Sequence, residues 1–193
     1  MSKIIAVVNQ KGGVGKTTTT MNLAAYLAEL GKFVLVVDMD PQGNATSGLG
    51  ISRADLAHGI YEALAKQKRI HDVVINTNHE GLRLVPATQD LAGANIELVD
   101  VERREFQLGD LLEELRHAYD YILIDCPPSL GLLTINSLVA ADEILIPVQA
   151  EYYALEGLGQ LLQTIGLVKE HIKPEISVLG AVLTMFDKRT KLA

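Results

Sequence analysis

The sequence predicts an α/β protein: an open, doubly wound, mostly parallel sheet flanked by helices. Short apolar segments at residues 4–8, 33–37 and 121–124 have the continuous Ile, Val and Leu content of strands that are buried on both faces. Stretches with apolar residues at helical spacing separate them, so strands and helices alternate along the chain. Such alternation is typical of a parallel sheet with a helix in each crossover.

The expected elements follow one another without a linker, an internal repeat or a low-complexity tract. In chain order they are a strand at 4–8, a helix at 17–30, a strand at 33–37, a long functional loop at 39–59, a short helix at 59–66, a short strand or turn at 71–75, a strand at 82–86, helices at 90–98 and 104–117, strands at 121–124 and 143–148, a helix at 155–169 and one more central strand at 176–184.

Composition narrows the class of protein. A chain of 193 residues is long enough to bury one real core, and we expect a single domain. No apolar run approaches the roughly twenty residues that span a bilayer, and the N-terminus lacks a signal-peptide layout, so we expect a cytoplasmic protein. The net charge of −7 argues against nucleic-acid binding by bulk charge. The lone Cys126 is expected to be a buried thiol.

The glycine-rich stretch at residues 8–18 predicts a phosphate site. Gly12, Gly13 and Gly15 can take positive φ, so successive backbone N–H groups can curl around an anion. A helix that begins near Lys16 adds its unpaired N–H groups and the positive end of its dipole. Lys16 can then reach the β- and γ-phosphates, and the Thr17 hydroxyl can ligate Mg²⁺.

Two standard glycine patterns fit this stretch imperfectly. The pattern G-x-x-x-x-G-K-[ST] requires glycine where the chain has Gln10, although its G-K-T end is intact. The dinucleotide pattern can begin at Gly13, with Asp38 as a ribose-binding acid, but Thr18 occupies its third glycine position. A lysine inside the turn suits a triphosphate better, and a merely flexible glycine turn is the remaining alternative.

Three acids stand at strand ends, where ligands bind in sheets of this kind: Asp38, Asp40 and Asp125. Asp125 follows four apolar residues, the layout of a Walker B acid that holds Mg²⁺, commonly through water. The alternatives are a helix cap at Asp125 and turn aspartates at the other two positions.

The sequence also resembles a known family. Residues 11–17, K-G-G-V-G-K-T, are similar to the deviant P-loop of the ParA/MinD ATPases. Residues 38–44, 125–131 and 151–158 resemble the chromosome-partitioning branch of that family, the ParA/Soj proteins. The resemblance extends over residues 1–193, which we expect to form one P-loop ATPase domain of the CbiA-like type. Because ParA/Soj chains normally continue with a last strand, terminal helices and a basic patch, this domain is expected to be incomplete at its C-terminus.

The resemblance implies ATP and Mg²⁺ as ligands and a slow switch that hydrolyses ATP to ADP and phosphate. It implies Thr17 and Asp125 as the metal site, the latter through water, and Lys11, Lys16 and Asp40 as catalytic residues. Asp40 would orient or deprotonate the attacking water, and Lys11 would reach across a dimer to the partner's phosphates. Asp38 would support the loop that follows it. The implied phosphate-binding residues are Lys11, Gly12, Gly13, Val14, Gly15, Lys16, Thr17 and Thr18.

The implied partners are a second copy of the chain when ATP is bound, a stimulating ParB-like protein, and DNA bound without sequence preference during chromosome or plasmid partitioning in the nucleoid. Arg189 aligns with a DNA-contacting arginine of the family, although a solvated surface arginine is an equal alternative. The segment at residues 184–187 resembles part of an adenine pocket, and residues 152–153 lie near the family's dimer interface. The alternatives to this function are a MinD-like ATPase on a membrane and a non-enzymatic fragment.

Overall fold

The structure, a computed structural model, describes residues 2–150 and 154–186, and within them the predicted doubly wound sheet is confirmed. The strand order is β3-β4-β2-β5-β1-β6-β7, and every pairing is parallel except that of β3 with β4. The strands are β1 (Lys3–Val7), β2 (Val34–Asp38), β3 (Ile75–Asn76), β4 (Leu82–Val85), β5 (Tyr121–Asp125), β6 (Glu143–Gln149) and β7 (Ser177–Thr184).

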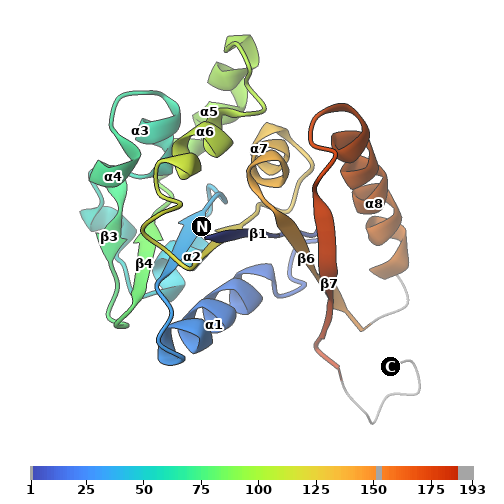
Figure 1. Cartoon of the computed structure of the whole chain (residues 1–193), viewed down its shortest axis with the longest axis horizontal. Helices are drawn as coiled ribbons and strands as arrows, with labels where there is room; N and C mark the ends of the chain where they lie inside the picture. The colour runs from blue at the N-terminus through green and yellow to red at the C-terminus, as the bar shows by residue number, and fades with distance from the viewer. Residues whose placement is uncertain (1, 151–153, 187–193) are drawn as a thin grey trace.

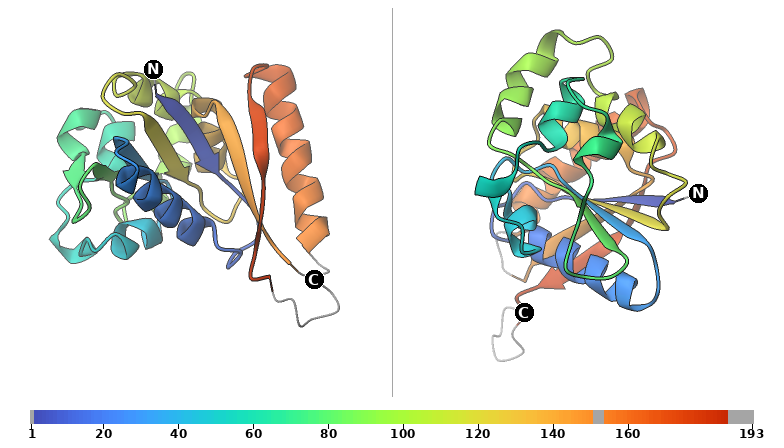
Figure 2. Two further views of the ribbon diagram at one scale, coloured as in Figure 1. Left: turned by 60° about the horizontal axis from the view of Figure 1, so that its bottom comes forward. Right: turned by 90° about the vertical axis from the view of Figure 1, so that its left-hand side faces the viewer.

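Helices lie on both faces of this sheet (Figures 1 and 2). They are α1 (Lys16–Glu29), α2 (Asn44–Gly48), α3 (Ile60–Leu64), α4 (Ile70–Val73), α5 (Leu91–Glu97), α6 (Gln107–Glu113), α7 (Leu132–Ala140) and α8 (Ala154–His171), with short 3₁₀ turns η1 (Arg53–Asp55) and η2 (Leu98–Asp100). None of the helices in the described residues is both long and apolar enough to cross a membrane.

The alternation of side chains along each strand divides the core into two layers. In β1, Ile5 and Val7 face α1 and α2, whereas Ile4 and Ala6 face the layer that holds α3 to α8. Both sets are buried, which explains why the sequence of β1 is continuously apolar.

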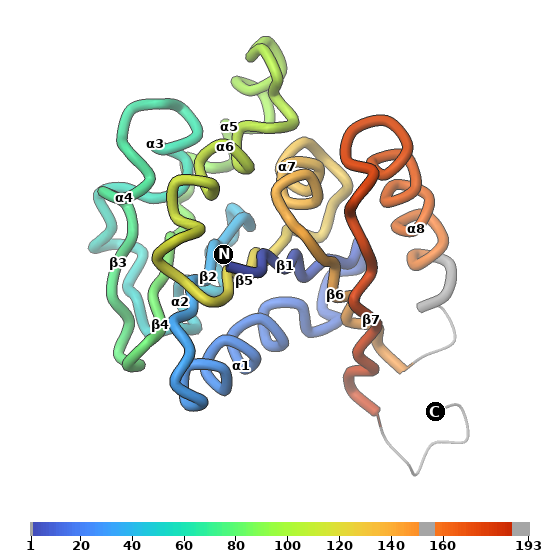
Figure 3. Tube along the Cα trace, in the orientation of Figure 1, coloured from blue at the N-terminus to red at the C-terminus, as the bar shows by residue number. Residues whose placement is uncertain are grey.

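The strand order sets the position of the acids. β1 and β2 follow one another in sequence but are not neighbours, because the chain passes through the other layer and returns as β5 between them (Figure 3). In register, Asp125 lies opposite Asp38 on one side and opposite Val7 on the other. The carboxyl ends of the three central strands therefore meet at one edge.

Several elements differ from the sequence prediction. The loop at 39–59 contains α2 and η1, and α4 precedes a very short β3 where a strand or turn was expected. The helix expected at 104–117 is regular only at Gln107–Glu113, and α7 had no predicted range. The strand expected to be central at 176–184 is an edge strand within the described residues, where both of its faces are largely exposed.

Candidate active site

The turn between β1 and α1 has the shape of a phosphate cradle. Gly13 and Gly15 adopt positive φ, at 74° and 87°, and Gly15 is the residue from which α1 begins. Gly12, which can also take positive φ, has a φ outside the left-handed region in this structure. The N-terminal turn of α1 is thereby directed at the cradle, where its free N–H groups favour an anion.

Two polar side chains fix this turn from outside it. The buried Asn9 accepts a hydrogen bond from the N–H of Lys11 (3.0 Å) and donates one to the carbonyl of Pro147 in β6 (2.7 Å). From the end of β7, the Thr184 hydroxyl donates to the carbonyl of Val14 (2.7 Å). Asn9 was assigned no role of its own from the sequence. Its signal is an asparagine directly after an apolar strand and shortly before a glycine-rich turn.

Lys16 is folded back into the cradle. Its side chain is buried, and Nζ donates to the carbonyl of Lys11 at 3.1 Å. Burial lowers the pKa of Lys16, although Asp125 and other nearby acidic groups oppose that effect. A phosphate oxygen would replace a carbonyl as the acceptor and would compensate a buried cation more fully.

Asp125 lies beneath the start of α1 and is fully buried. Its carboxylate accepts hydrogen bonds from the hydroxyls of Thr17 (2.7 Å) and Thr20 (3.2 Å). Burial raises its pKa from 3.8 to about 7, against the effect of the Thr17 hydrogen bond and with a contribution from Asp38. Thr20 was missed in the sequence, although its spacing of three from Thr17 places both hydroxyls on one face of a helix.

Asp38, at the end of β2, is equally buried and has a pKa raised to about 6, chiefly by burial. It accepts hydrogen bonds from the backbone N–H of Asp40 (3.2 Å) and from both the N–H and the hydroxyl of Thr46 (2.8 and 2.7 Å). The expectation that Asp38 supports the following loop agrees with these contacts.

Asp40 begins the loop between β2 and α2. Its side chain is buried and accepts a hydrogen bond from the N–H of Gln42 (2.9 Å). The guanidinium of Arg53 lies over this loop and donates to the carbonyls of Pro41 (2.9 Å) and Gln42. Asp40 is therefore held by the loop and is among the residues that line the adjoining cavity.

A cavity of about 460 Å³ lies between the phosphate cradle and the Asp40 loop, at the edge of the sheet. Its lining combines the cradle, the first turns of α1, the Asp40 loop, and Pro128 and Met185 from other parts of the chain. The lining residues are Gly12, Gly13, Gly15, Lys16, Thr17, Thr18, Met21, Asp40, Gln42, Asn44, Pro128 and Met185. Met185 belongs to the segment expected near adenine. Arg189 and residues 152–153 lie outside the described residues.

The donor set fits a nucleotide phosphate with Mg²⁺. The cradle offers backbone N–H groups and Lys16, while Thr17 and Asp125 place a hydroxyl and a carboxylate 2.7 Å apart beside it. Mg²⁺ in such sites keeps several waters and shares phosphate oxygens, so it does not need a cage of protein ligands. Residues 2–150 and 154–186 contain no group of three or more His, Cys, Asp or Glu arranged to hold a metal by themselves.

The sequence is similar to a described protein family and to named bacterial proteins. A family profile described as "AAA domain" matches residues 2–178. The sporulation initiation inhibitor protein Soj of Bacillus subtilis is 57% identical over 100% of this chain and 76% of its own length. The chromosome partitioning protein ParA of Myxococcus xanthus is 56% identical over 100% of this chain and 68% of its own length.

A solved structure is also similar. A Mycobacterium smegmatis protein described as cobyrinic acid a,c-diamide synthase, with bound ADP and magnesium, superposes with a TM-score of 0.95 at 43% identity. The match covers 98% of this chain and 77% of that one. Together with the glycine cradle, these similarities show that the chain belongs to the ParA/Soj branch of the deviant P-loop ATPases, a family of ATP hydrolases.

Proposed function

We propose that this chain is a Mg²⁺-ATP-dependent switch that hydrolyses ATP slowly and changes its association state with the nucleotide. The observation that carries the proposal is the single cavity in which the cradle, Lys16, Thr17 and Asp40 meet. A phosphate chain bound there would have cationic and N–H donors on one side and the Asp40 loop on the other. That arrangement suits phosphoryl transfer, in which positioning and charge neutralisation do most of the work.

Each side chain would have a distinct task. Lys16 and the N–H groups of the cradle would bind and orient the β- and γ-phosphates. Lys11, Val14 and Thr18 would contribute as further residues of the same turn. Thr17 and Asp125 would hold Mg²⁺, Asp125 through water; the ion, when bound, neutralises charge on the phosphates. Asp40 would orient the water that attacks the γ-phosphate or take its proton.

Lys11 would act across a dimer. Its backbone is fixed by Asn9 at the mouth of the turn, and its side chain is half-exposed. A lysine at this point can contact the phosphates of a second subunit that faces the cavity, and it would serve as an arginine finger does in other phosphoryl-transfer enzymes. Dimerisation would then depend on ATP, because ATP has a γ-phosphate with which Lys11 of the second subunit can pair and ADP does not.

The relatives suggest the class of partner, since two of them are named for chromosome partitioning or sporulation control. We propose that the ATP-bound dimer binds DNA without sequence preference, at the nucleoid in the cytoplasm, and that a ParB-like partner stimulates hydrolysis. A net charge of −7 per chain is compatible with this if basic residues of two subunits, Arg189 among them, share one face. Binding to anionic vesicles in place of DNA would favour a MinD-like role.

The similarity to the Mycobacterium smegmatis protein suggests amidation as a second candidate, for which Cys126 is poorly suited as the nucleophile that releases ammonia from glutamine. A thiolate is the usual nucleophile for releasing ammonia from glutamine, and Cys126 is the single cysteine of the sequence. It is buried, and burial raises its pKa to about 12. Such a thiol is inert at neutral pH.

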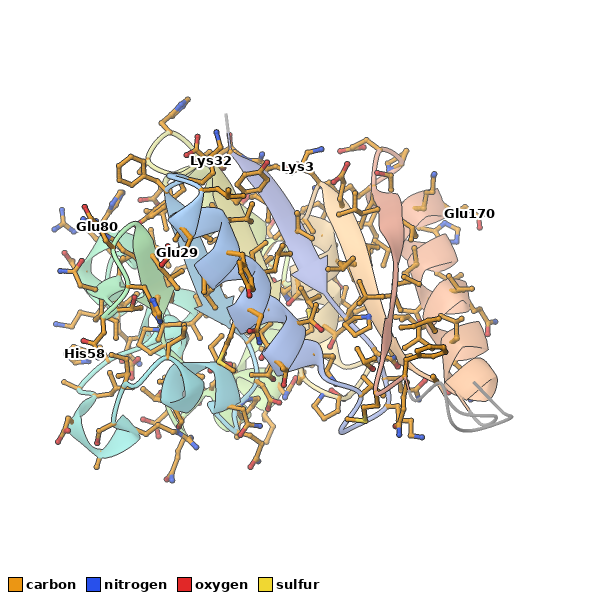
Figure 4. The ribbon with its side chains drawn as sticks, turned by 90° about the horizontal axis from the view of Figure 1, so that it is seen from below. Lys3, Glu29, Lys32, His58, Glu80 and Glu170 are labelled. Carbon is orange, nitrogen blue, oxygen red and sulfur yellow. The ribbon has the colours of Figure 1, made fainter. Side chains whose placement is uncertain are left out.

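The test is the mass of the protein in solution with Mg²⁺-ATP and with Mg²⁺-ADP. Asp40→Ala should abolish turnover and be dimeric only with ATP, because the nucleotide is retained unhydrolysed. Lys11→Ala should abolish both turnover and the ATP-dependent dimer. Lys32→Ala is the matched control: this exposed lysine lies just after α1, at the end of the sheet away from the cradle (Figure 4), and its loss should change neither property.

The opposite results would contradict the proposal at separate points. If Lys11→Ala hydrolyses ATP and dimerises as the unchanged protein does, the role of Lys11 is wrong. If Asp40→Ala turns over normally, Asp40 does not act on the attacking water. A monomer with both nucleotides would exclude the switch in this chain.

A further inference from the structure

Thr46 ties together the ends of two neighbouring strands beside the candidate active site. It is fully buried in α2, and its N–H and hydroxyl both donate to one oxygen of Asp38, at 2.8 and 2.7 Å. The same hydroxyl accepts a hydrogen bond from the backbone N–H of Ala87 at 3.0 Å. Asp38 ends β2 and Ala87 lies just beyond β4, which pairs with β2 in parallel. The hydroxyl thus both donates and accepts.

The other oxygen of Asp38 holds the start of the same loop. It accepts a hydrogen bond from the backbone N–H of Asp40 at 3.2 Å. One buried carboxylate therefore fixes the loop between Asp40 and Thr46 at both of its ends. The loop is closed between them by the hydrogen bond from the N–H of Gly43 to the carbonyl of Asp40, at 2.8 Å.

Helix α2 cannot supply this order alone. It comprises only Asn44–Gly48, and it begins from Gly43, which has no side chain to cap it. Isolated helices of this length do not persist in water, because one or two hydrogen bonds do not compensate the entropy of nucleation. The position of α2, and of the loop before it, therefore depends on contacts made by the side chains of α2. Among these side chains, that of Thr46 is buried and hydrogen-bonded to Asp38 and Ala87.

We propose that Thr46 is a positioning residue for ATP hydrolysis: its hydroxyl, clamped between Asp38 and Ala87, holds the loop that aims Asp40 at the phosphate site. The inference rests on the proposed role of Asp40. Displacement of a reacting group by about 1 Å can cost on the order of a hundredfold in rate. Loss of the hydroxyl should therefore slow the chemical step while the cradle still binds nucleotide, because the side-chain hydrogen bonds of Thr46 go to Asp38 and Ala87 and not to the cradle.

The experiment compares Thr46→Val, Thr46→Ala and Thr46→Ser in the full chain with Asp40→Ala. Steady-state kinetics give kcat and KM, and a fluorescent ADP analogue gives nucleotide affinity. We expect kcat to fall about tenfold to a hundredfold in Thr46→Val and Thr46→Ala, with ADP affinity within about twofold. Thr46→Ser keeps the hydroxyl and should retain kcat within about threefold. If the valine variant does not fold, the alanine and serine variants carry the same comparison.

Amide hydrogen exchange supplies a readout of the loop itself. Peptides that cover residues 41–48 should exchange faster in the variants without the hydroxyl and normally in Thr46→Ser, while peptides from α8 stay unchanged. A kcat unchanged in Thr46→Val and Thr46→Ala would overturn the inference, as would an equal loss of ADP affinity, which indicates a general structural role. Normal turnover by Asp40→Ala would instead overturn the proposed function on which the inference rests.

Discussion

Replacing Asp125 with asparagine should stabilise the nucleotide-free protein at neutral and alkaline pH. The carboxyl group is fully buried and has a pKa of about 7, against 3.8 in an exposed position. A group whose pKa is raised by folding gives its full contribution to stability below the unfolded pKa and loses it as the pH rises through the folded pKa. For Asp125 the loss therefore extends from about pH 4 to about pH 7.

The size of the effect follows from the two pKa values. Their difference is about 3 pH units, and each unit corresponds to about 1.4 kcal/mol, so the unprotonated carboxylate destabilises the fold by up to about 4 kcal/mol at pH 8. Asparagine avoids that charge but pairs less well with two hydroxyl donors, Thr17 and Thr20, so we expect a net gain of about 2–4 kcal/mol at pH 8. Near pH 4 the two proteins should have similar stability.

Urea unfolding at constant ionic strength, with chelator and without nucleotide, measures this difference between pH 4 and pH 8. Asp142→Asn is the control of opposite sign. Burial would raise the pKa of Asp142, but Arg116 and the N–H of Ile4 outweigh it, so that the pKa is lowered and the control should lose stability at neutral pH. If the free energies of unfolding of Asp125→Asn and the unchanged protein stay parallel across this range, the pKa of Asp125 is not raised by folding.

Two further substitutions test residues that hold the site. Thr20→Val removes a hydroxyl that donates a hydrogen bond to Asp125, and it should weaken Mg²⁺-dependent nucleotide binding by about tenfold, the value of a hydrogen bond to a charged group. Thr20→Ser keeps the hydroxyl and should leave that binding unchanged. Titration with Mg²⁺ at a fixed ADP concentration measures the difference. Arg53→Ala removes the donors to the carbonyls of Pro41 and Gln42 and should lower kcat severalfold. The unfolding free energy should change by less than about 1 kcal/mol. An unchanged kcat would show that the loop does not need Arg53.

The parts of the site that the sequence predicted are those with a local cause. An apolar run that ends in glycines, and then in lysine and threonine, specifies strand, turn and helix within about ten residues, and Gly13 and Gly15 have the expected positive φ. The acids at strand ends were predicted for the same reason, because parallel strands place their carboxyl ends at one edge. Asp38 and Asp125 indeed lie opposite each other in register.

What the sequence did not reveal depends on residues far away along the chain. Asn9 is held by Pro147, and Thr46 by Ala87, and neither partner can be inferred from spacing. The strand order belongs to the same class, since nothing local to residues 121–125 indicates that β5 lies between β1 and β2. Helix α2 was missed for a different reason, because five residues without apolar periodicity look like a loop.

The two buried carboxylates connect binding to loop position. Asp38 and Asp125 are neighbours across β2 and β5, and both pKa values are raised, so without a cation the site is costly to keep ionised. A cation held by Asp125 would lower this cost, because a positive charge favours the ionised form of nearby carboxylates and opposes the rise in the pKa of Asp125 that Asp38 contributes to. Since Asp38 also holds the N–H groups of Asp40 and Thr46, a fully charged Asp38 accepts those hydrogen bonds more strongly. Cation binding at one strand end should thus tighten the loop at the next.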